Sequence, residues 1–194
     1  QKEIGKTNNV FTYEITDENG QSINSNYKVE SKYGTLTVYG EINYNANGGT
    51  GDTPKADRYD AGDTYTVKDN MFTRAGYNFG SWNTQADGKG TTYAEGSQIT
   101  SLQNNVTLYA QWIANSDTQY SVATYLEGEN GYPTDPTTIV KRSGETDTTV
   151  SVTEDDKTAP EGYALDPNAD NVFEGTVLGD GSLVLKVYFA KDEI

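Results

Sequence analysis

Cysteine and histidine are both absent from the 194 residues. Without them the chain cannot form a Ser-His-Asp or Cys-His nucleophilic system, a thiolate metal site or an imidazole zinc site. A Walker-type phosphate loop is also missing. Acidic residues are plentiful enough for the carboxylate pair of a glycoside hydrolase, but such a pair needs a cleft, and modules of about 70 residues rarely enclose the roughly 300 Å³ that a ligand needs. We therefore predict a protein that is not an enzyme, with no catalytic residues, no cofactor and no metal site.

Positive charge is scarce, with 14 basic residues against 29 acidic ones and a formal net charge of -15. No cluster of Lys and Arg compensates for this, so nucleic acids and anionic membrane surfaces would be repelled. The acidic surface favours solubility and a monomer.

Long apolar runs are also missing, and no stretch approaches the roughly 20 apolar residues of a membrane span. We expect no membrane insertion within this sequence. No signal peptide opens the chain at Gln1, which leaves either a cytosolic protein or an internal piece of a longer exported one. The absence of cysteine argues against a secreted eukaryotic module, and it is compatible with export by a Gram-positive bacterium.

Hydrophobic residues make up 34% of the chain and its mean hydropathy is -0.75, which suits several small cores and not one large core. Tyrosine dominates the large side chains, with 15 copies against 5 of phenylalanine. A tyrosine ring can pack on a half-buried sheet while its hydroxyl stays hydrated. The composition therefore favours strands and turns over helices.

Residues 41–112 and residues 120–190 form an internal pseudo-repeat. Each half contains, in the same order, a β-type run, a Gly/Asn-rich turn, a Thr/Val-rich run, a Gly-Tyr pair, an Asp-Gly turn and a closing strand. In the first half these features lie at 42–45, 47–49, 62–67, 76–77, 87–88 and 106–112. In the second half they lie at 120–126, 128–131, 144–152, 162–163, 180–181 and 183–189.

The closing strands alternate with a period of two, which indicates a sheet with one face on a core. The expected core-facing residues are Val106, Leu108, Ala110 and Trp112 in the first half, and Leu183, Leu185, Val187 and Phe189 in the second. Helix is scarce, and only 68–72 and 153–157 could hold one or two turns. We predict a mainly β or α+β fold built of tandem β-grasp (ubiquitin-like) modules in an elongated arrangement.

Residues 1–40 differ from both halves, with expected strands at 10–16, 27–30 and 35–38 and a turn at 18–20. They are interpreted as a partial β module, either the tail of an immunoglobulin-like or related surface repeat or strands that pair with the next module. Residues 113–119 are interpreted as a short linker. The predicted domains are therefore 1–40, 41–113 and 118–194.

Three motifs in the first half resemble a known family. Asn47, Gly48 and Gly49 follow an aromatic residue, the segment 76–82 has the form Gly-Tyr-x-Phe-x-x-Trp, and the half ends with Leu-Tyr-Ala-x-Trp at 108–112. Residues 41–112 resemble the Listeria–Bacteroides repeat of the internalin B type. Asn83 departs from that family, in which Tyr or Phe usually follows the Trp. The resemblance implies a β-grasp-like fold on a bacterial surface protein.

Residues 118–190 resemble the mucin-binding-protein-type (MucBP-like) repeats of Gram-positive surface proteins, through the segments 160–165, 174–177 and 180–188. The segment 158–163 is also similar to the Glu-box of Cna-B-type pilin domains, which carry Lys–Asn isopeptide bonds. The Glu of that family falls on Asp156, and no partner lysine is identifiable. A crosslink is therefore a hypothesis that intact mass can test, since the bond releases one ammonia.

Several residues have both a functional and a structural interpretation. Asp166, Asn168 and Asp170 are spaced like the start of a calcium loop, but Asn171 and Val177 occupy the positions where Gly and Glu are needed. A solvated turn is the preferred interpretation. Trp82 and Trp112 could form a sugar-stacking platform, although core packing is preferred. The exposed tyrosines Tyr39, Tyr109 and Tyr188 could bind a ligand or form cross-strand pairs.

Three functions remain compatible with these features. The first is a non-catalytic stalk or spacer, with possible adhesive capacity, in a bacterial surface protein that is extracellular and attached to the cell wall through parts outside this sequence. The second is a binding module for host glycoprotein, glycan or cell-wall components. The third is an accessory region of a large secreted carbohydrate-active enzyme. The ligand-binding residues cannot be named from the sequence.

Overall fold

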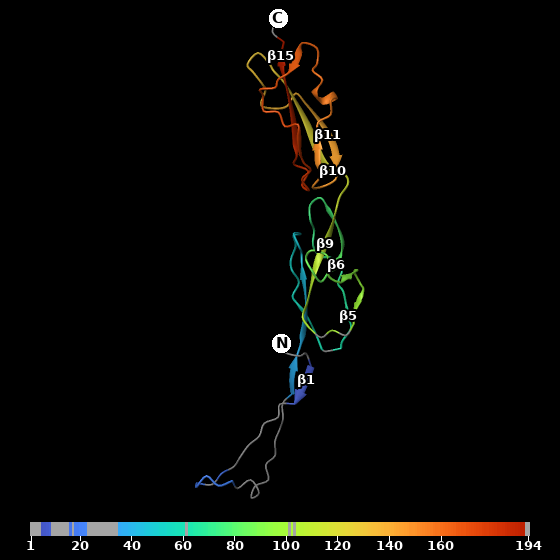
Figure 1. Ribbon diagram of the computed structural model, residues 1–194, viewed down its shortest axis with the longest axis vertical. Coiled ribbons are helices and arrows are strands. Elements are labelled where there is room, and N and C mark those ends of the chain that lie inside the picture. The colour runs from blue at the N-terminus through green and yellow to red at the C-terminus, as the bar shows by residue number, and fades with distance from the viewer. Residues whose placement is uncertain are drawn as a thin grey trace.

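The computed structural model describes residues 5–8, 16, 18–22, 35–60, 62–100, 102 and 104–192. Nearly all regular structure in these residues is β-strand, and the strands are arranged along one long axis (Figure 1). This confirms the predicted mainly β fold with little helix. Within the described residues no helix has the length and apolar character needed to cross a bilayer.

The first large sheet has five strands in the order β4-β3-β9-β6-β7. Its members are β3 (Gly40–Asn45), β4 (Asp57–Tyr59), β6 (Tyr77–Asn83), β7 (Thr92–Tyr93) and β9 (Val106–Ala114). The pair β3–β9 is parallel and the other pairs are antiparallel. A small second sheet pairs β5 (Tyr65–Thr66) with β8 (Gln98–Ile99).

The second large sheet repeats this wiring, in the order β11-β10-β15-β13. Its members are β10 (Thr118–Leu126), β11 (Thr138–Gly144), β13 (Tyr163–Leu165) and β15 (Val184–Lys191). Here β10–β15 is the parallel pair, and β12 (Thr149–Ser151) with β14 (Glu174–Thr176) forms the small accompanying sheet. In both sheets the first and last strands lie side by side in the centre, as in a β-grasp fold.

We call the two sheets, with their loops, the first unit and the second unit. Each has a core of its own. Trp82 is fully buried at the centre of the first core, where the rings of Tyr44 and Phe79 lie with centroids 4.8 and 5.0 Å from its own. The second core gathers around Val177, Leu185, Val187 and Phe189, all at most 1% exposed.

The predicted alternation of the closing strands is confirmed. Leu108 and Ala110 are buried on β9, and Leu185, Val187 and Phe189 are buried on β15. The outer members of each set, Val106, Trp112 and Leu183, are half-buried against the same cores. The domain boundaries at 41–113 and 118–194 stay a prediction.

The segment 68–72 contains no helix, so that expectation was wrong. A helical turn there would need the amide of Phe72 to donate to the carbonyl of Lys68. The Lys68 carbonyl instead accepts the indole N–H of Trp82 at 3.0 Å, and the Phe72 amide donates to Asn70 Oδ1 at 2.9 Å. The other expected site does form one turn of 3-10 helix, η2 (Asp155–Lys157), and Thr153 Oγ1 accepts the amide of Asp156 at 3.2 Å.

Part of the first 40 residues is described. Strand β2 (Thr35–Val38) confirms one expected strand, and it pairs with β1 (Gly5–Asn8), which the sequence did not predict. The expected turn at 18–20 is present, between Thr16 and Ser22, which form an isolated bridge. The rest of the expected strand at 10–16, and the whole of the one at 27–30, lie outside the described residues.

Replacing a core residue of one unit should unfold that unit alone, if the two cores are energetically separate. Leu185→Ala should cost the second unit about 2–5 kcal/mol, because it removes buried methyl groups and leaves a cavity. Val184→Ala, on the exposed face of the same strand, is the control. Both tryptophans of the chain lie in the first core. Tryptophan fluorescence should therefore report an unchanged urea midpoint for the first unit. The methyl NMR signals of Val187 should report a lower urea midpoint for the second unit.

A single transition that moves for both probes together would contradict separate cores.

Candidate functional site

The feature common to both units is the parallel pair formed by their first and last strands. In the first unit β3 pairs with β9 in a register from Ile42 with Val106 to Asn45 with Tyr109. In the second unit β10 pairs with β15 over a longer register, from Ser121 with Val184 to Leu126 with Phe189. Two backbone hydrogen bonds mark the ends of this second ladder, Ser121 N–H to Leu183 O and Glu127 N–H to Phe189 O, both 3.0 Å.

Because each pair is parallel, the start of its first strand and the end of its last strand lie at opposite ends of the unit. Tension applied through the chain would therefore slide the two strands past each other. All the hydrogen bonds of the ladder would be loaded at once, and not one after another as in an unzipping hairpin. Val122, Leu185 and Val187 are buried beside the second ladder, which keeps water away from its hydrogen bonds.

The joint between the two units is short. Strand β9 ends at Ala114 and β10 begins at Thr118, so the linker predicted at 113–119 is in fact only residues 115–117. Backbone hydrogen bonds fix this linker to both units. The Asn115 amide donates to Gly76 O, and the Asn115 carbonyl accepts from the Thr146 amide, both at 2.9 Å. The longer linker prediction was wrong because the strand pairing of each sheet extends beyond its hydrophobic run.

Two buried threonines form the polar centre of this joint. The hydroxyls of Thr118 and Thr146 lie 2.7 Å apart, and Thr146 Oγ1 also donates to Gly76 O at 2.8 Å. Thr146 is 2% exposed and Thr118 8%. Since Gly76 belongs to the first unit and Thr146 to the second, these hydrogen bonds hold the units in one relative orientation.

Two glycines allow the backbones of the units to meet. A Cβ added to Gly179 would lie 2.1 Å from the carbonyl oxygen of Ala75, and one added to Gly76 would lie 2.3 Å from Gly179 Cα.

A side-chain hydrogen bond also crosses the joint. The hydroxyl of Tyr77 donates to the carboxylate of Asp147, and this hydrogen bond raises the pKa of Tyr77. The guanidinium of Arg74 lies over the Tyr77 ring, 3.9 Å from its centroid.

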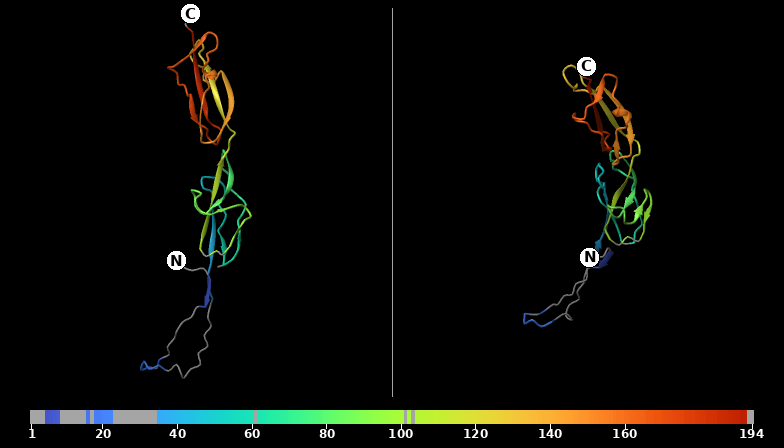
Figure 2. Two further views of the ribbon diagram at one scale, coloured as in Figure 1. Left: turned by 45° about the vertical axis from the view of Figure 1, so that its right-hand side comes forward. Right: turned by 45° about the horizontal axis from the view of Figure 1, so that its top comes forward.

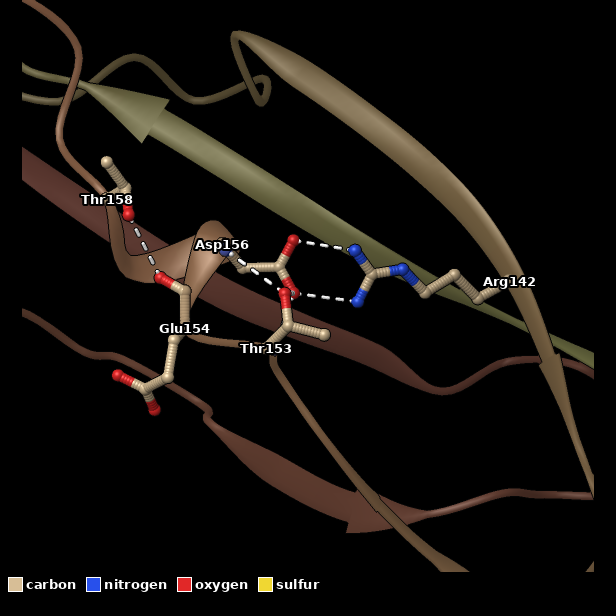
Figure 3. A network of polar contacts seen from close by, with 5 residues as sticks. All are labelled: Arg142, Thr153, Glu154, Asp156 and Thr158. Atoms are coloured by element: carbon tan, nitrogen blue, oxygen red, sulfur yellow. Dashed lines mark hydrogen bonds and ion pairs between the residues drawn. The ribbon is translucent and has the colours of Figure 1, made fainter.

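A polar network holds the 3-10 turn of the second unit (Figure 3). Arg142 donates two hydrogen bonds of 2.7 Å to the two carboxylate oxygens of Asp156, whose side chain is 11% exposed. The hydrogen bonds from Arg142 hold the pKa of Asp156 below its usual value, with a further contribution from Thr153, whereas partial burial opposes the shift. The residue at the Glu-box position thus faces an arginine and not a lysine, and the isopeptide crosslink stays a hypothesis.

The two tryptophans occupy the core positions that were the preferred interpretation. Trp82 is fully buried, and the Trp112 indole N–H donates to Ala46 O at 2.9 Å while its ring packs on Phe79. A Cβ on Gly49 would lie 2.5 Å from the Trp112 ring, which explains the second glycine of the Asn-Gly-Gly motif. The Trp82 ring is therefore closed to solvent, and the Trp112 ring is half-buried against the same core.

The three candidate tyrosines lie apart from one another. Tyr39 is 49% exposed with Arg58 over its ring, and Tyr109 is half-buried on β9. Tyr188 is half-buried on β15 and stacks on Tyr125, which the sequence did not single out. The structure therefore brings one of the three into a larger aromatic group, and the other two stay separate.

The segment 166–171 is a hydrogen-bonded turn, in line with the preferred interpretation. Asp166 Oδ1 accepts the Asn168 amide at 2.9 Å, and Asn171 Nδ2 donates to Asp166 O at 2.7 Å. Among the described residues no three or more acidic side chains gather as a metal site.

The joint was not predicted from the sequence. The residues that meet in it are 70 positions apart, as for Gly76 and Thr146, and no local pattern marks them. The one signal in the sequence was the pair Gly76 and Gly179. It could not be used, because a glycine at a close backbone approach cannot be distinguished from a turn glycine by sequence alone.

Replacing Gly179 by alanine should open the joint without unfolding either unit, because the added methyl group would overlap the Ala75 carbonyl. We expect residual dipolar couplings of the two units to report a changed relative orientation, with both urea transitions nearly unchanged. Gly128→Ala, where a Cβ would lie 3.6 Å from the nearest atom, is the control. Identical couplings in Gly179→Ala and the unsubstituted chain would contradict a fixed joint.

Asp156→Asn should destabilise the second unit by about 1–3 kcal/mol at pH 7, because it leaves Arg142 without its charged partner. A carboxyl whose pKa is lowered on folding adds stability above its unfolded pKa of about 3.9, and this stability is lost as the pH falls through the folded value. The difference between variant and parent should therefore shrink below about pH 4. Urea unfolding, monitored by the methyl NMR signals of Leu185 at each pH, measures the loss of stability at pH 7 and its decrease below about pH 4.

The exposed neighbour Asp155 supplies the control variant, Asp155→Asn. An equal loss of stability in the two variants at pH 7, or a difference for Asp156→Asn that persists at about pH 2, would contradict this assignment.

Comparisons with known proteins support part of this description. No curated protein matches the chain. Among solved structures, the chain is similar to one described as the crystal structure of Mub-RV, with 16% sequence identity, 80% of this chain and 99% of that chain covered, and a TM-score of 0.18. A TM-score this low does not establish a shared arrangement of the two chains. Residues 41–111 match the model of the Listeria-Bacteroides repeat domain, which confirms the family resemblance that the three motifs predicted for this part of the chain.

Proposed function

We propose that this chain is a non-catalytic spacer that resists tension in a bacterial cell-surface protein. The observation that carries the proposal is the parallel, adjacent placement of the first and last strands in both units. The arrangement occurs in both units in succession. In a spacer pulled from both ends, both ladders would therefore be loaded in shear.

The joint supports the same function. Tension that leaves the first unit at Ala114 enters the second at Thr118, across residues 115–117. The hydrogen bonds between Gly76, Asn115 and Thr146 would keep the two ladders in line, so that neither unit is pulled sideways. Figure 2 shows the two units following one another along the long axis in both further views.

The match to a repeat family over residues 41–111 and the net charge of -15 also favour a surface location. Repeated small units with their own cores extend a functional end from a cell without a large fold. We further propose that the protein is extracellular, that it is attached to the cell wall through parts of its parent outside this sequence, and that the units divide at 41–113 and 118–194.

Single-molecule pulling in two directions tests the proposal, and the absence of cysteine makes engineered attachment points unique. Gln119→Cys with Lys191→Cys would load the β10–β15 ladder in shear. Gln119→Cys with Ser182→Cys would unzip the same ladder from one end. All three residues are exposed. We expect the unfolding force in shear to exceed that in unzipping at the same loading rate, because several hydrogen bonds of the ladder must break together.

The two double-cysteine variants share the same core, so urea unfolding of both should give the same free energy and exclude a difference in stability as the cause. Equal unfolding forces in the two directions would overturn the proposal that this unit is built to resist tension.

A further inference from the structure

Two tyrosines face each other on the paired central strands of the second unit. Tyr125, near the end of β10, and Tyr188 on β15 are partners in the parallel register. Their rings stack with the centroids 4.4 Å apart and the planes 9° from parallel. The other aromatic ring pairs in the described part of the chain are edge-on or tilted. The strand register therefore holds two phenol rings face to face.

The stacked pair lies outside the hydrophobic core. The core-facing residues of β15 are Leu185, Val187 and Phe189, so Tyr188 points to the opposite face of the strand. Its ring is half-buried there, and the Tyr125 ring against it is 8% exposed. The core cluster of the second unit contains neither tyrosine. A chemical change at the pair would therefore leave the core packing in place.

A pocket of about 540 Å³ opens beside the stack, lined by Tyr125, Tyr188 and Tyr132. The Tyr132 ring stands against Tyr188 with an interplanar angle of 83°, and its hydroxyl donates to Asp166 Oδ2 at 2.8 Å. Asn171 Oδ1 accepts the Tyr188 amide at 2.9 Å, which fixes the opposite wall to β15. The pocket gives water and small solutes an ordered approach to the Tyr188 ring.

Stacked phenols are arranged for oxidative coupling. A phenol that loses one electron and its hydroxyl proton becomes a phenoxyl radical, whose unpaired electron occupies π orbitals perpendicular to the ring plane. In the stack of Tyr125 and Tyr188 these orbitals point from one ring to the other. In the edge-on pair of Tyr132 and Tyr188 they are nearly perpendicular. The geometry therefore favours a bond between the two stacked rings over a bond to Tyr132.

The second unit contains no sulfur that would compete for an oxidant. Cysteine is absent from the chain, and its one methionine, Met71, packs against the first core. Thiols and thioethers are the side chains that oxidants commonly modify in proteins. Their absence from the second unit leaves its tyrosines as candidate sites of oxidation.

We propose that Tyr125 and Tyr188 are a site of oxidative crosslinking to dityrosine by a diffusible one-electron oxidant. Two equivalents of the oxidant take one electron from each phenol, and each hydroxyl proton passes to water. The two radicals form one carbon–carbon bond between the ring positions ortho to their hydroxyls. The ring hydrogen on each bonded carbon then moves, through water, to the oxygen of its own ring and restores the phenol. The pair thus loses two electrons and two protons, and the oxidant gains the two electrons.

The crosslink would join β10 to β15 near the end of their ladder. The two strands could then not slide apart under tension, because the force between Thr118 and Lys191 would pass through the new covalent bond. A covalent link between residues distant in sequence also restricts the unfolded chain, which stabilises the folded unit. The proposal goes beyond the spacer function, and its chemistry does not depend on that function.

Oxidation of the complete chain by tris(bipyridyl)ruthenium(III), generated by light with persulfate, tests the proposal. The chain is kept dilute so that coupling between molecules is slow. The monomer should lose the mass of two hydrogen atoms and gain dityrosine fluorescence, and peptide mapping should place the link between Tyr125 and Tyr188. The crosslinked monomer should also unfold at a higher urea concentration than the untreated chain, as monitored by the methyl NMR signals of Leu185.

Tyr125→Phe and Tyr188→Phe keep the stacked rings but remove one phenol each, so each should reduce the dityrosine fluorescence of the monomer to background. Tyr109→Phe is the matched control, because Tyr109 is half-buried on the last strand of the first unit and its register partner is Asn45. This variant should keep the full yield of crosslink. The methyl signals of Val187 verify that each variant is folded.

The proposal is overturned if no dityrosine forms within the monomer, or if peptide mapping places the link between other tyrosines. It is equally overturned if the monomer fluorescence survives in Tyr125→Phe or Tyr188→Phe.

Discussion

The pairing of the first strand of each unit with its last strand is the constraint on which the rest of the structure depends. β3 and β9, like β10 and β15, are distant in sequence, so their contact closes the whole unit around one core. The strands that lie outside them, such as β4 and β11, add to an edge that already exists. Loss of the central pair would leave the edge strands with no sheet to join, which makes each unit cooperative although its core is small.

The same pairing determines where other features lie. Because the paired strands are parallel, each unit begins and ends at opposite poles, and the second unit can follow the first after the short connecting segment 115–117. One pole of the second unit is therefore occupied by the joint. The other pole carries the loop after β10. Together with the segment after β13, which runs back along β15, this loop forms a pocket lined by Tyr125, Tyr132 and Tyr188. Strands supply the scaffold, and its free end supplies the surface available for binding.

The alternating strands and the repeat could be predicted from the sequence because they rest on short-range patterns. The period of two around Leu108 and Leu185 identifies the core face directly, and the Asn-Gly and Asp-Gly pairs mark turns through positive φ, as at Gly48 and Gly88. The expected helix at 68–72 failed for a physical reason. The indole of Trp82, distant in sequence, takes the carbonyl that the helix would need.

The joint and the pocket could not be predicted because their residues meet only after folding. Gly76 and Gly179 lie in different units, and Tyr132 reaches Tyr188 across a loop without regular structure. Tyr188 was singled out as an exposed strand residue, but nothing in its surrounding sequence names Tyr125 and Tyr132 as its neighbours. Contacts of this kind need the strand order, which hydrophobic periodicity does not contain.

Native-state hydrogen exchange of the complete chain tests the central role of the parallel pairs most directly. If these pairs close each unit, the ladder amides of β10 and β15 should exchange only through global unfolding of the second unit and should be its slowest. The amides of β11, at the edge of the same sheet, should exchange faster through local opening. Exchange from β10 and β15 that is as fast as exchange from β11 would contradict the account.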